Sequence, residues 1–132
     1  MYIKTTGMIL KIEPDKTIAA LQQEFNAAFP FLKIEFFKNG KTLQRMYPPQ
    51  QLVNKEATLA AARLTNKQGE VLVADTMTVK ELEQDFFDSF GLTVQVFRKS
   101  GRLWLETTMT DNWTLKQQNQ HGKEISAPPR TD

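Results

Sequence analysis

The sequence contains no cysteine, and this absence removes several classes of site at once. Disulfide bonds, thiol nucleophiles and cysteine-ligated metals are all excluded. Lys4 and Lys11 interrupt the N-terminal residues where a signal peptide would need an unbroken apolar stretch. No apolar run elsewhere is long enough to cross a membrane. We therefore expect a cytoplasmic protein that does not contact a membrane.

Residues that carry chemistry are also scarce. His121 is the only histidine, and it lies near the C-terminus beside a glycine. None of the three serines lies in a Gly-x-Ser-x-Gly setting. The sequence also lacks a glycine-rich phosphate loop, a His-Glu-x-x-His motif and a calcium loop. We therefore expect no enzymatic activity, no cofactor and no metal.

The chain has little net charge. Seventeen basic side chains oppose fifteen acidic ones, which gives a formal charge of +2 over 132 residues. A charge of this size does not by itself indicate binding to nucleic acid. The length is that of one domain with a real core.

One pattern occurs twice in the chain. Its helical part begins at Thr17 in the first half and at Thr78 in the second. The matching positions are Leu21 and Leu82, Gln23 and Gln84, Glu24 and Asp85, Phe25 and Phe86, and Phe29 and Phe90. The flanking segments match as well, so residues 7–63 and 69–119 are predicted to be two copies of one unit.

Each copy changes its hydrophobic period in the same order. Ile18, Leu21 and Phe25 recur at helical spacing. A threonine followed three residues later by glutamate, as at Thr78 and Glu81, is typical of a helix start. Residues 32–37 and 92–97 then alternate as strands do when one face is buried.

The ends of the two copies complete the predicted unit. Residues 99–102 predict a tight turn into a return strand at 103–108, and the first copy has a matching return strand at 41–47. Each copy is predicted to close with a short helix, at 55–63 and at 112–119.

The fold class that follows is α+β, built from two copies of a β-α-β-β-α unit. We expect a mixed sheet or sheets with helices packed on one face, because a strand, a helix and a strand in that order form a right-handed crossover when the strands are parallel. The first unit covers residues 1–64 and the second 69–119. Residues 120–132 have no hydrophobic period and contain two prolines, and we expect a disordered tail.

The repeated motif supports a resemblance. Residues 17–29 and 78–90 both read Thr-[Val/Ile]-x-x-Leu-x-Gln-[Glu/Asp]-Phe-x-x-x-Phe, and residues 57–63 read Ala-Thr-Leu-Ala-x-x-Arg. Over most of residues 7–119 the chain resembles an uncharacterised bacterial tandem-repeat domain. Pro30 replaces the glycine usual there, and Trp113 stands in place of the alanine of the last motif. No activity, cofactor or catalytic residue is established for such domains, so the resemblance implies an architecture and no function.

Aromatic residues mark a candidate interaction surface. Phe37, Phe97 and Trp104 fall on strand positions that point away from the helices, and Phe87 interrupts the apolar stripe of the second helix where the first has Asn26. An apolar open sheet face attracts a partner protein or a second copy. The alternative is that the other repeat covers this face.

Basic residues gather at the two predicted hairpin turns. They are Lys38, Lys41 and Arg45 in the first copy and Arg98, Lys99 and Arg102 in the second. Cations beside aromatic rings suit phosphates with stacked bases. The alternative, which the small net charge favours, is solvated charge that deters strand edges from pairing.

The second helix also has an acidic face. Glu81, Asp85 and Asp88 share one side at helical spacing, where a divalent cation needs converging oxygen ligands. An ordinary solvated helix face explains these residues better.

These features together predict a small non-enzymatic module that binds a partner protein, or itself, through an open sheet face or a strand edge. The alternative is a weak nucleic-acid-binding protein that uses the basic turns. Salt dependence separates the two, because phosphate binding falls steeply with added salt.

Overall fold

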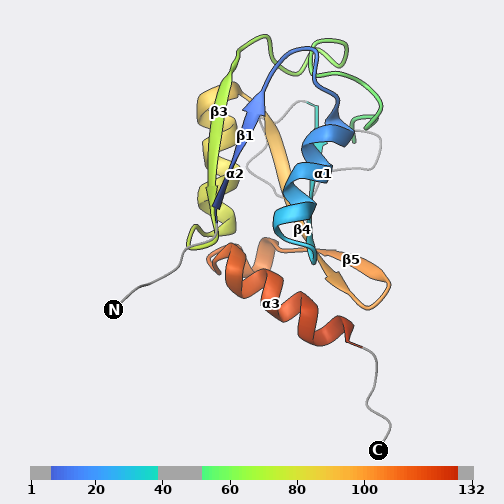
Figure 1. The fold of residues 1–132 in the computed structure, drawn as a ribbon, viewed down its shortest axis with the longest axis vertical. Coiled ribbons are helices and arrows are strands. Elements are labelled where there is room, and N and C mark those ends of the chain that lie inside the picture. The colour runs from blue at the N-terminus through green and yellow to red at the C-terminus, as the bar shows by residue number, and fades with distance from the viewer. Residues whose placement is uncertain (1–6, 39–51, 128–132) are drawn as a thin grey trace, which may run out of the picture.

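The computed structural model describes residues 7–38 and 52–127, which form an α+β fold (Figure 1). The elements in chain order are β1 (Gly7–Ile12), α1 (Ile18–Ala28), β2 (Leu32–Phe37), β3 (Gly69–Ala74), α2 (Val79–Phe90), β4 (Thr93–Ser100), β5 (Leu103–Glu106), the 3-10 helix η2 (Thr108–Thr110) and α3 (Leu115–Ser126). The predicted α+β class is confirmed. The return strand predicted at 41–47 lies outside the described residues.

Both sheets in the described part of the chain are antiparallel. One has two strands in the order β1-β3, and the other has three in the order β2-β4-β5. The predicted mixed sheet is therefore wrong. The strands that flank one helix do not pair with each other, because β1 pairs with β3 and β2 pairs with β4.

The first two helices connect the two sheets. Helix α1 contacts β1 and β2, and α2 contacts β3 and β4. The rings of Phe36 on β2 and Phe86 on α2 meet edge to face with their centres 6.0 Å apart. Buried apolar side chains from both halves of the chain form one cluster. Because each fully buried large side chain contributes about 1.5–3 kcal/mol, this shared core dominates the stability of the fold.

Local signals set the ends of α2 as predicted. Thr78 Oγ1 accepts a hydrogen bond from the backbone of Glu81 at 3.1 Å, and the Glu81 carboxylate accepts one from the backbone of Thr78 at 2.9 Å. This capping box pairs backbone donors that the helix itself leaves open. Gly91 ends the helix with φ at 67°, a left-handed conformation that glycine adopts without steric cost.

The helix predicted at 55–63 is wrong, since that segment forms turns. Ala62 donates to the carbonyl of Thr58 as in a helix, but the next two bonds close the turn. Leu64 donates to Leu59 and Arg63 donates to Ala60, the paired bonds of a Schellman motif. Arg63 has a φ of 56°, so the chain leaves the helical conformation after one turn in spite of its alanines.

The last helix is longer than predicted. Helix α3 runs to Ser126, so the disordered tail expected from residue 120 is wrong for 120–126. Thr114 and Gln117 form a capping box at its start. Leu115, Gln118 and Gly122 are buried at spacings of one helical turn, against β4 and β2. Two of these three are not apolar, which explains why the segment shows no hydrophobic period. Residues 128–132 lie outside the described residues.

The loops before α1 and α2 are held by similar sets of contacts. Thr17 forms an isolated antiparallel bridge with Thr58, and Thr78 forms one with Thr114. Beside the first bridge are four backbone hydrogen bonds, each written from the N–H donor to the carbonyl acceptor: Ile18 to Ala57, Ala19 to Lys55, Leu59 to Lys16 and Ala60 to Pro14. Those beside the second run from Val79 to Trp113, Lys80 to Asp111, Leu115 to Met77 and Lys116 to Asp75.

Candidate functional site

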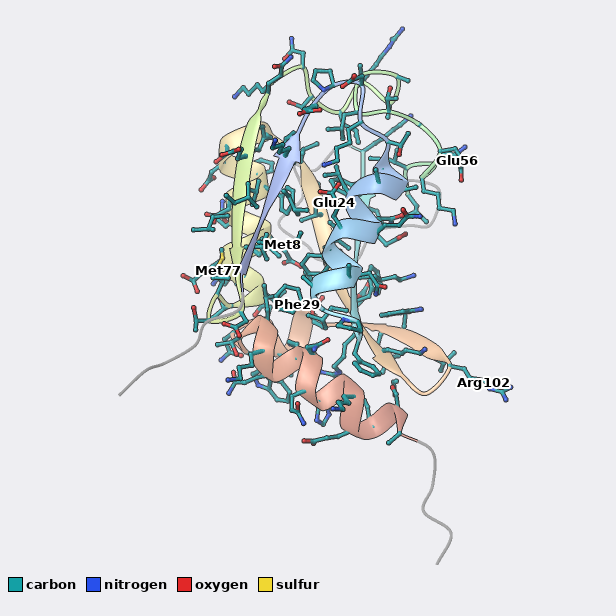
Figure 2. All side chains as sticks on the ribbon, in the orientation of Figure 1. Met8, Glu24, Phe29, Glu56, Met77 and Arg102 are labelled. Carbon is teal, nitrogen blue, oxygen red and sulfur yellow. The ribbon has the colours of Figure 1, made fainter. Side chains whose placement is uncertain are left out.

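The β4–β5 hairpin projects past α1 and α2 at the end of the molecule that carries α3 (Figure 1), and its turn lies beside the last residue of α3. Its turn is made by Gly101 and Arg102, between the paired residues Ser100 and Leu103. Gly101 has a φ of 63°, as the first central position of a two-residue hairpin turn requires. Arg102 points outward from the tip (Figure 2). The predicted hairpin is confirmed, and it carries the most exposed part of the sheet.

The two edges of the three-stranded sheet differ. Side chains of α1 occupy the edge of β2: Gln22 Nε2 donates to the carbonyl of Ile34 at 2.8 Å, and Asn26 Nδ2 donates to that of Leu32 at 2.9 Å. The backbone of Val53 donates to the carbonyl of Phe36. No described strand pairs with the outer edge of β5. Of the two edges, β5 is the one available for pairing.

The outer face of the hairpin carries a cluster of one cation and two aromatic rings. Lys33 lies opposite Phe97 in the register of β2 and β4. Its Nζ is 5.6 Å from the centre of the Phe97 ring and 5.1 Å from that of Trp104. Both distances are within the range of a cation–π interaction. Phe97 and Trp104 are half-buried, so the lysine covers part of the apolar surface that they present.

The inner face of β5 exposes two leucines. Leu103 is 66% exposed and Leu105 is 41% exposed. They pair with Ser100 and Arg98, on the face of the sheet opposite Trp104. Ser126, the last residue of α3, contacts the turn through its Oγ, which accepts from Gly101 N at 3.0 Å and donates to the Lys99 carbonyl at 3.2 Å. β5 therefore presents apolar groups on both faces of an edge that no other described strand occupies.

Arg98 faces inward from β4 and not toward the tip. Its Nη1 donates to Gln118 Oε1 at 2.8 Å, and its guanidinium carbon lies 5.8 Å from the centre of the Trp113 ring. Trp113 in turn meets the ring of His121 edge to face. Burial lowers the pKa of Arg98, and its Nε is buried without a hydrogen-bond partner. The residue holds α3 against the sheet.

The structure separates the other predicted site residues. Phe37 is only 6% exposed and lies opposite Thr93, at the far end of β4 from the hairpin turn. The eight residues of β4 span roughly 24 Å, so Phe37 and the neighbouring Lys38 are far from the exposed Arg102. Phe87 is 43% exposed on α2, the helix that covers the opposite face of the sheet. Lys41 and Arg45 lie outside the described residues.

The structure therefore brings together Phe97 and Trp104, with Lys99 opposite Trp104 on the same face. Sequence reasoning missed Lys33, Leu103 and Leu105. Leucines alternating in a strand indicate a buried face, and only the position of β5 beyond α1 and α2 shows that these two are exposed. Ile9 and Leu72 are a second exposed pair, opposite each other on β1 and β3.

The acidic face of α2 is occupied by local hydrogen bonds. Glu81 belongs to the capping box, and Asp88 accepts a hydrogen bond from Gln84 at 2.8 Å. Within residues 7–38 and 52–127, no three histidine, cysteine, aspartate or glutamate side chains are grouped so that they could hold a metal ion. None of the helices in these two ranges is both long and apolar enough to span a bilayer.

Comparison with known proteins adds no functional assignment. No family model matches the chain, and searches of curated proteins and of solved structures likewise found no match.

Proposed function

We propose that this chain is a small, non-enzymatic protein-interaction module that binds through the β4–β5 hairpin. The observation that carries the proposal is the outer edge of β5, which no strand within residues 7–38 and 52–127 pairs with and which combines exposed Leu103 and Leu105 on one face with half-buried Trp104 on the other. An extended segment that pairs with such an edge gains backbone hydrogen bonds, and side chains on both faces supply specificity.

Photo-crosslinking tests this proposal in the cells that contain the protein. A photoreactive amino acid is placed at Leu103, and in a matched variant at Leu72, because these leucines are 66% and 64% exposed and both lie on strands. We expect Leu103 to form a discrete adduct with a protein, which includes a second copy of the chain. Leu72 should form markedly less. Equal and diffuse labelling at both positions contradicts the proposal.

Nucleic-acid binding is the second candidate. Lys99 lies opposite Trp104, and Lys33 lies over Phe97 and Trp104, so cations and aromatic rings share one face. This combination suits phosphate contacts with base stacking. Lys99→Glu with Arg102→Glu should then abolish retention of a single-stranded oligonucleotide at low salt. The candidate is rejected if the unmodified protein retains none.

We also propose that the chain consists of two copies of one unit, of the tandem-repeat type that its motif resembles. The four backbone bonds around the Thr17–Thr58 bridge join positions that match, residue for residue, those around the Thr78–Thr114 bridge. The matching strands also pair with each other, β1 with β3 and β2 with β4. In this arrangement the second copy carries the binding hairpin, and the first contributes to the shared core.

A further inference from the structure

The direction of the backbone groups along β4 follows from bonds at its edges. Val96 N donates to Glu83 Oε2 at 3.0 Å, and the Val96 carbonyl accepts from Thr107 Oγ1 at 2.9 Å, both away from β2. Lys99 N donates to the carbonyl of Phe31, which immediately precedes β2. Backbone groups alternate in direction along a strand. Those of Arg98 and Ser100 therefore face β5.

The same alternation determines which way the backbone groups of β5 point. Leu105 pairs with Arg98 and Leu103 pairs with Ser100, so the backbone groups of both leucines face β4. The N–H and C=O of Trp104 then point to the outer edge, and so do those of Glu106. A strand added at this edge must bond to Trp104 and not to the leucines.

We propose that the strand added at this edge is β5 of a second copy of the chain, antiparallel and centred on Trp104. This inference rests on the proposed function and names its partner. Antiparallel hydrogen-bonded pairs join residues whose backbone groups face each other, so a two-fold axis must pass through a residue and not between two. An axis through Trp104 or through Leu105 would pair three of the four residues of β5, and of these two registers only the one centred on Trp104 sets Arg102 opposite Glu106.

The side chains around Trp104 are complementary to themselves in this register. Trp104 lies opposite Trp104 of the second copy, and Leu103 lies opposite Leu105, so the exposed leucines of both copies meet on one face. Arg102 lies opposite Glu106, and both residues are exposed in the single chain. Charges usually protect an open edge from other strands. Here opposite charges stand two residues on either side of the centre, so they attract a second copy and repel a strand with a different pattern.

The pairing joins the two three-stranded sheets into one continuous sheet. It covers the apolar surface of Leu103 and Leu105, which the single chain leaves exposed where β5 extends past α1 and α2. The contact is short, so the dimer is weak and depends on concentration.

Charge reversal tests the register. Sedimentation equilibrium on the full chain should show a monomer–dimer equilibrium. Arg102→Glu alone sets a glutamate opposite Glu106 in both pairs across the axis, and Glu106→Arg alone sets an arginine opposite Arg102 in both. Each variant should therefore weaken the dimer on the order of tenfold. An equimolar mixture of the two variants restores both opposite-charge pairs and should dimerise as well as the unmodified chain, as should the double variant. A chain that stays monomeric at all concentrations overturns the inference, and so does a dimer that neither single reversal weakens.

A cysteine at the centre provides an independent test, because the chain has none of its own. Residues in a hydrogen-bonded antiparallel pair have Cα atoms about 5.5 Å apart, within the range that a disulfide spans. Trp104→Cys should therefore form a disulfide-linked dimer under mild oxidation, and Leu72→Cys at the same concentration should not. Equal linking of both variants overturns the inference.

The two proposals fail differently. If the chain is monomeric but Leu103 still crosslinks to another protein, the second copy is the wrong partner and the interaction module stands. If Leu103 also labels no better than Leu72, both proposals are rejected.

Discussion

Arg98 Nη1 lies 2.8 Å from Gln118 Oε1, and this hydrogen bond joins β4 to α3. Gln118 is fully buried, and its Nε2 donates at 2.8 Å to both the carbonyl and the Oγ1 of Thr110. One amide thus connects a strand, a helix and the segment between them. A polar side chain in this position stabilises the fold only while all its partners are in place.

We predict that Gln118→Ala destabilises the protein by about 1–3 kcal/mol, because it leaves the Arg98 guanidinium and the Thr110 carbonyl without their partner. Urea unfolding measures the change, and hydrogen exchange should show faster opening of α3. Gln120→Ala is the matched control, since Gln120 is exposed on the same helix and its side chain donates a hydrogen bond to Glu124 one turn further on. Equal stability of the two variants contradicts the prediction.

Gly122→Ala should destabilise the protein although alanine is the better helix former. A Cβ at this position lies 2.9 Å from Phe31 Cβ, 3.1 Å from Arg98 Cγ and 3.2 Å from the Phe31 carbonyl. The higher helix propensity of alanine would stabilise the fold by about 1 kcal/mol, whereas overpacking at this position destabilises it by about 1–3 kcal/mol. We expect a lower thermal midpoint for Gly122→Ala and little change for the exposed Lys123→Ala. A higher midpoint for Gly122→Ala means that α3 is not packed this closely.

The capping box of α2 predicts a pH dependence. Hydrogen bonds from the backbone and then the side chain of Thr78 lower the pKa of Glu81 below its ordinary value. Between the folded and unfolded pKa values the unfolded chain binds more protons, so the stabilisation is present above about pH 4.3 and is lost as the pH falls through the folded pKa. Glu81→Gln, which copies the neutral Gln117 of α3, should remove this part of the pH dependence.

Urea midpoints at pH 7 and pH 3 check this prediction. The unmodified chain should lose more stability than Glu81→Gln between the two values. Gln117→Glu provides the reverse control, because it places a carboxylate in the second box and should add a dependence of the same sign. Parallel pH profiles for all three proteins contradict the assignment.

Arg63→Gly should stabilise the protein by about 0.5–1 kcal/mol. Arg63 holds a φ of 56° at the Schellman motif, a conformation that costs a residue with a Cβ more than it costs glycine. Arg63→Ala removes the same side chain but keeps the Cβ, so it should give no gain. Denaturant unfolding of the two variants separates the backbone effect from any effect of the charge.

The ends of helices and the hairpin turn were predictable where residues close in sequence determine them. Thr78 with Glu81 and Gly91 define α2, and Gly101 defines the hairpin turn. The prediction failed where contacts with residues distant in sequence stabilise the element. Gly122 was assigned to a disordered tail and Gln118 to the end of a short helix, but the helix they belong to packs against Arg98 and Phe31. At residues 55–63 the alanines favour a helix, but the Schellman bonds of Arg63 and Leu64 end it after one turn.

The candidate site was only partly predictable for the same reason. Phe97 and Trp104 share a face because of the register between β4 and β5, which the hairpin turn determines locally. Phe37 was expected to share an exposed face with them, but the antiparallel pairing of β2 with β4 places it at the other end of the sheet, where it is buried.

The sequence by itself determined the helices and strands of this protein wherever hydrophobic period and capping residues agree, because those signals act within one or two turns of chain. Only the tertiary structure decided which strand pairs with which, and therefore which side chains are exposed. The repeating pattern is compatible with parallel strands in one sheet as well as with the observed exchange between halves. Among the described strands, that exchange leaves the outer edge of β5 unpaired, with Leu103 and Leu105 as its exposed apolar residues.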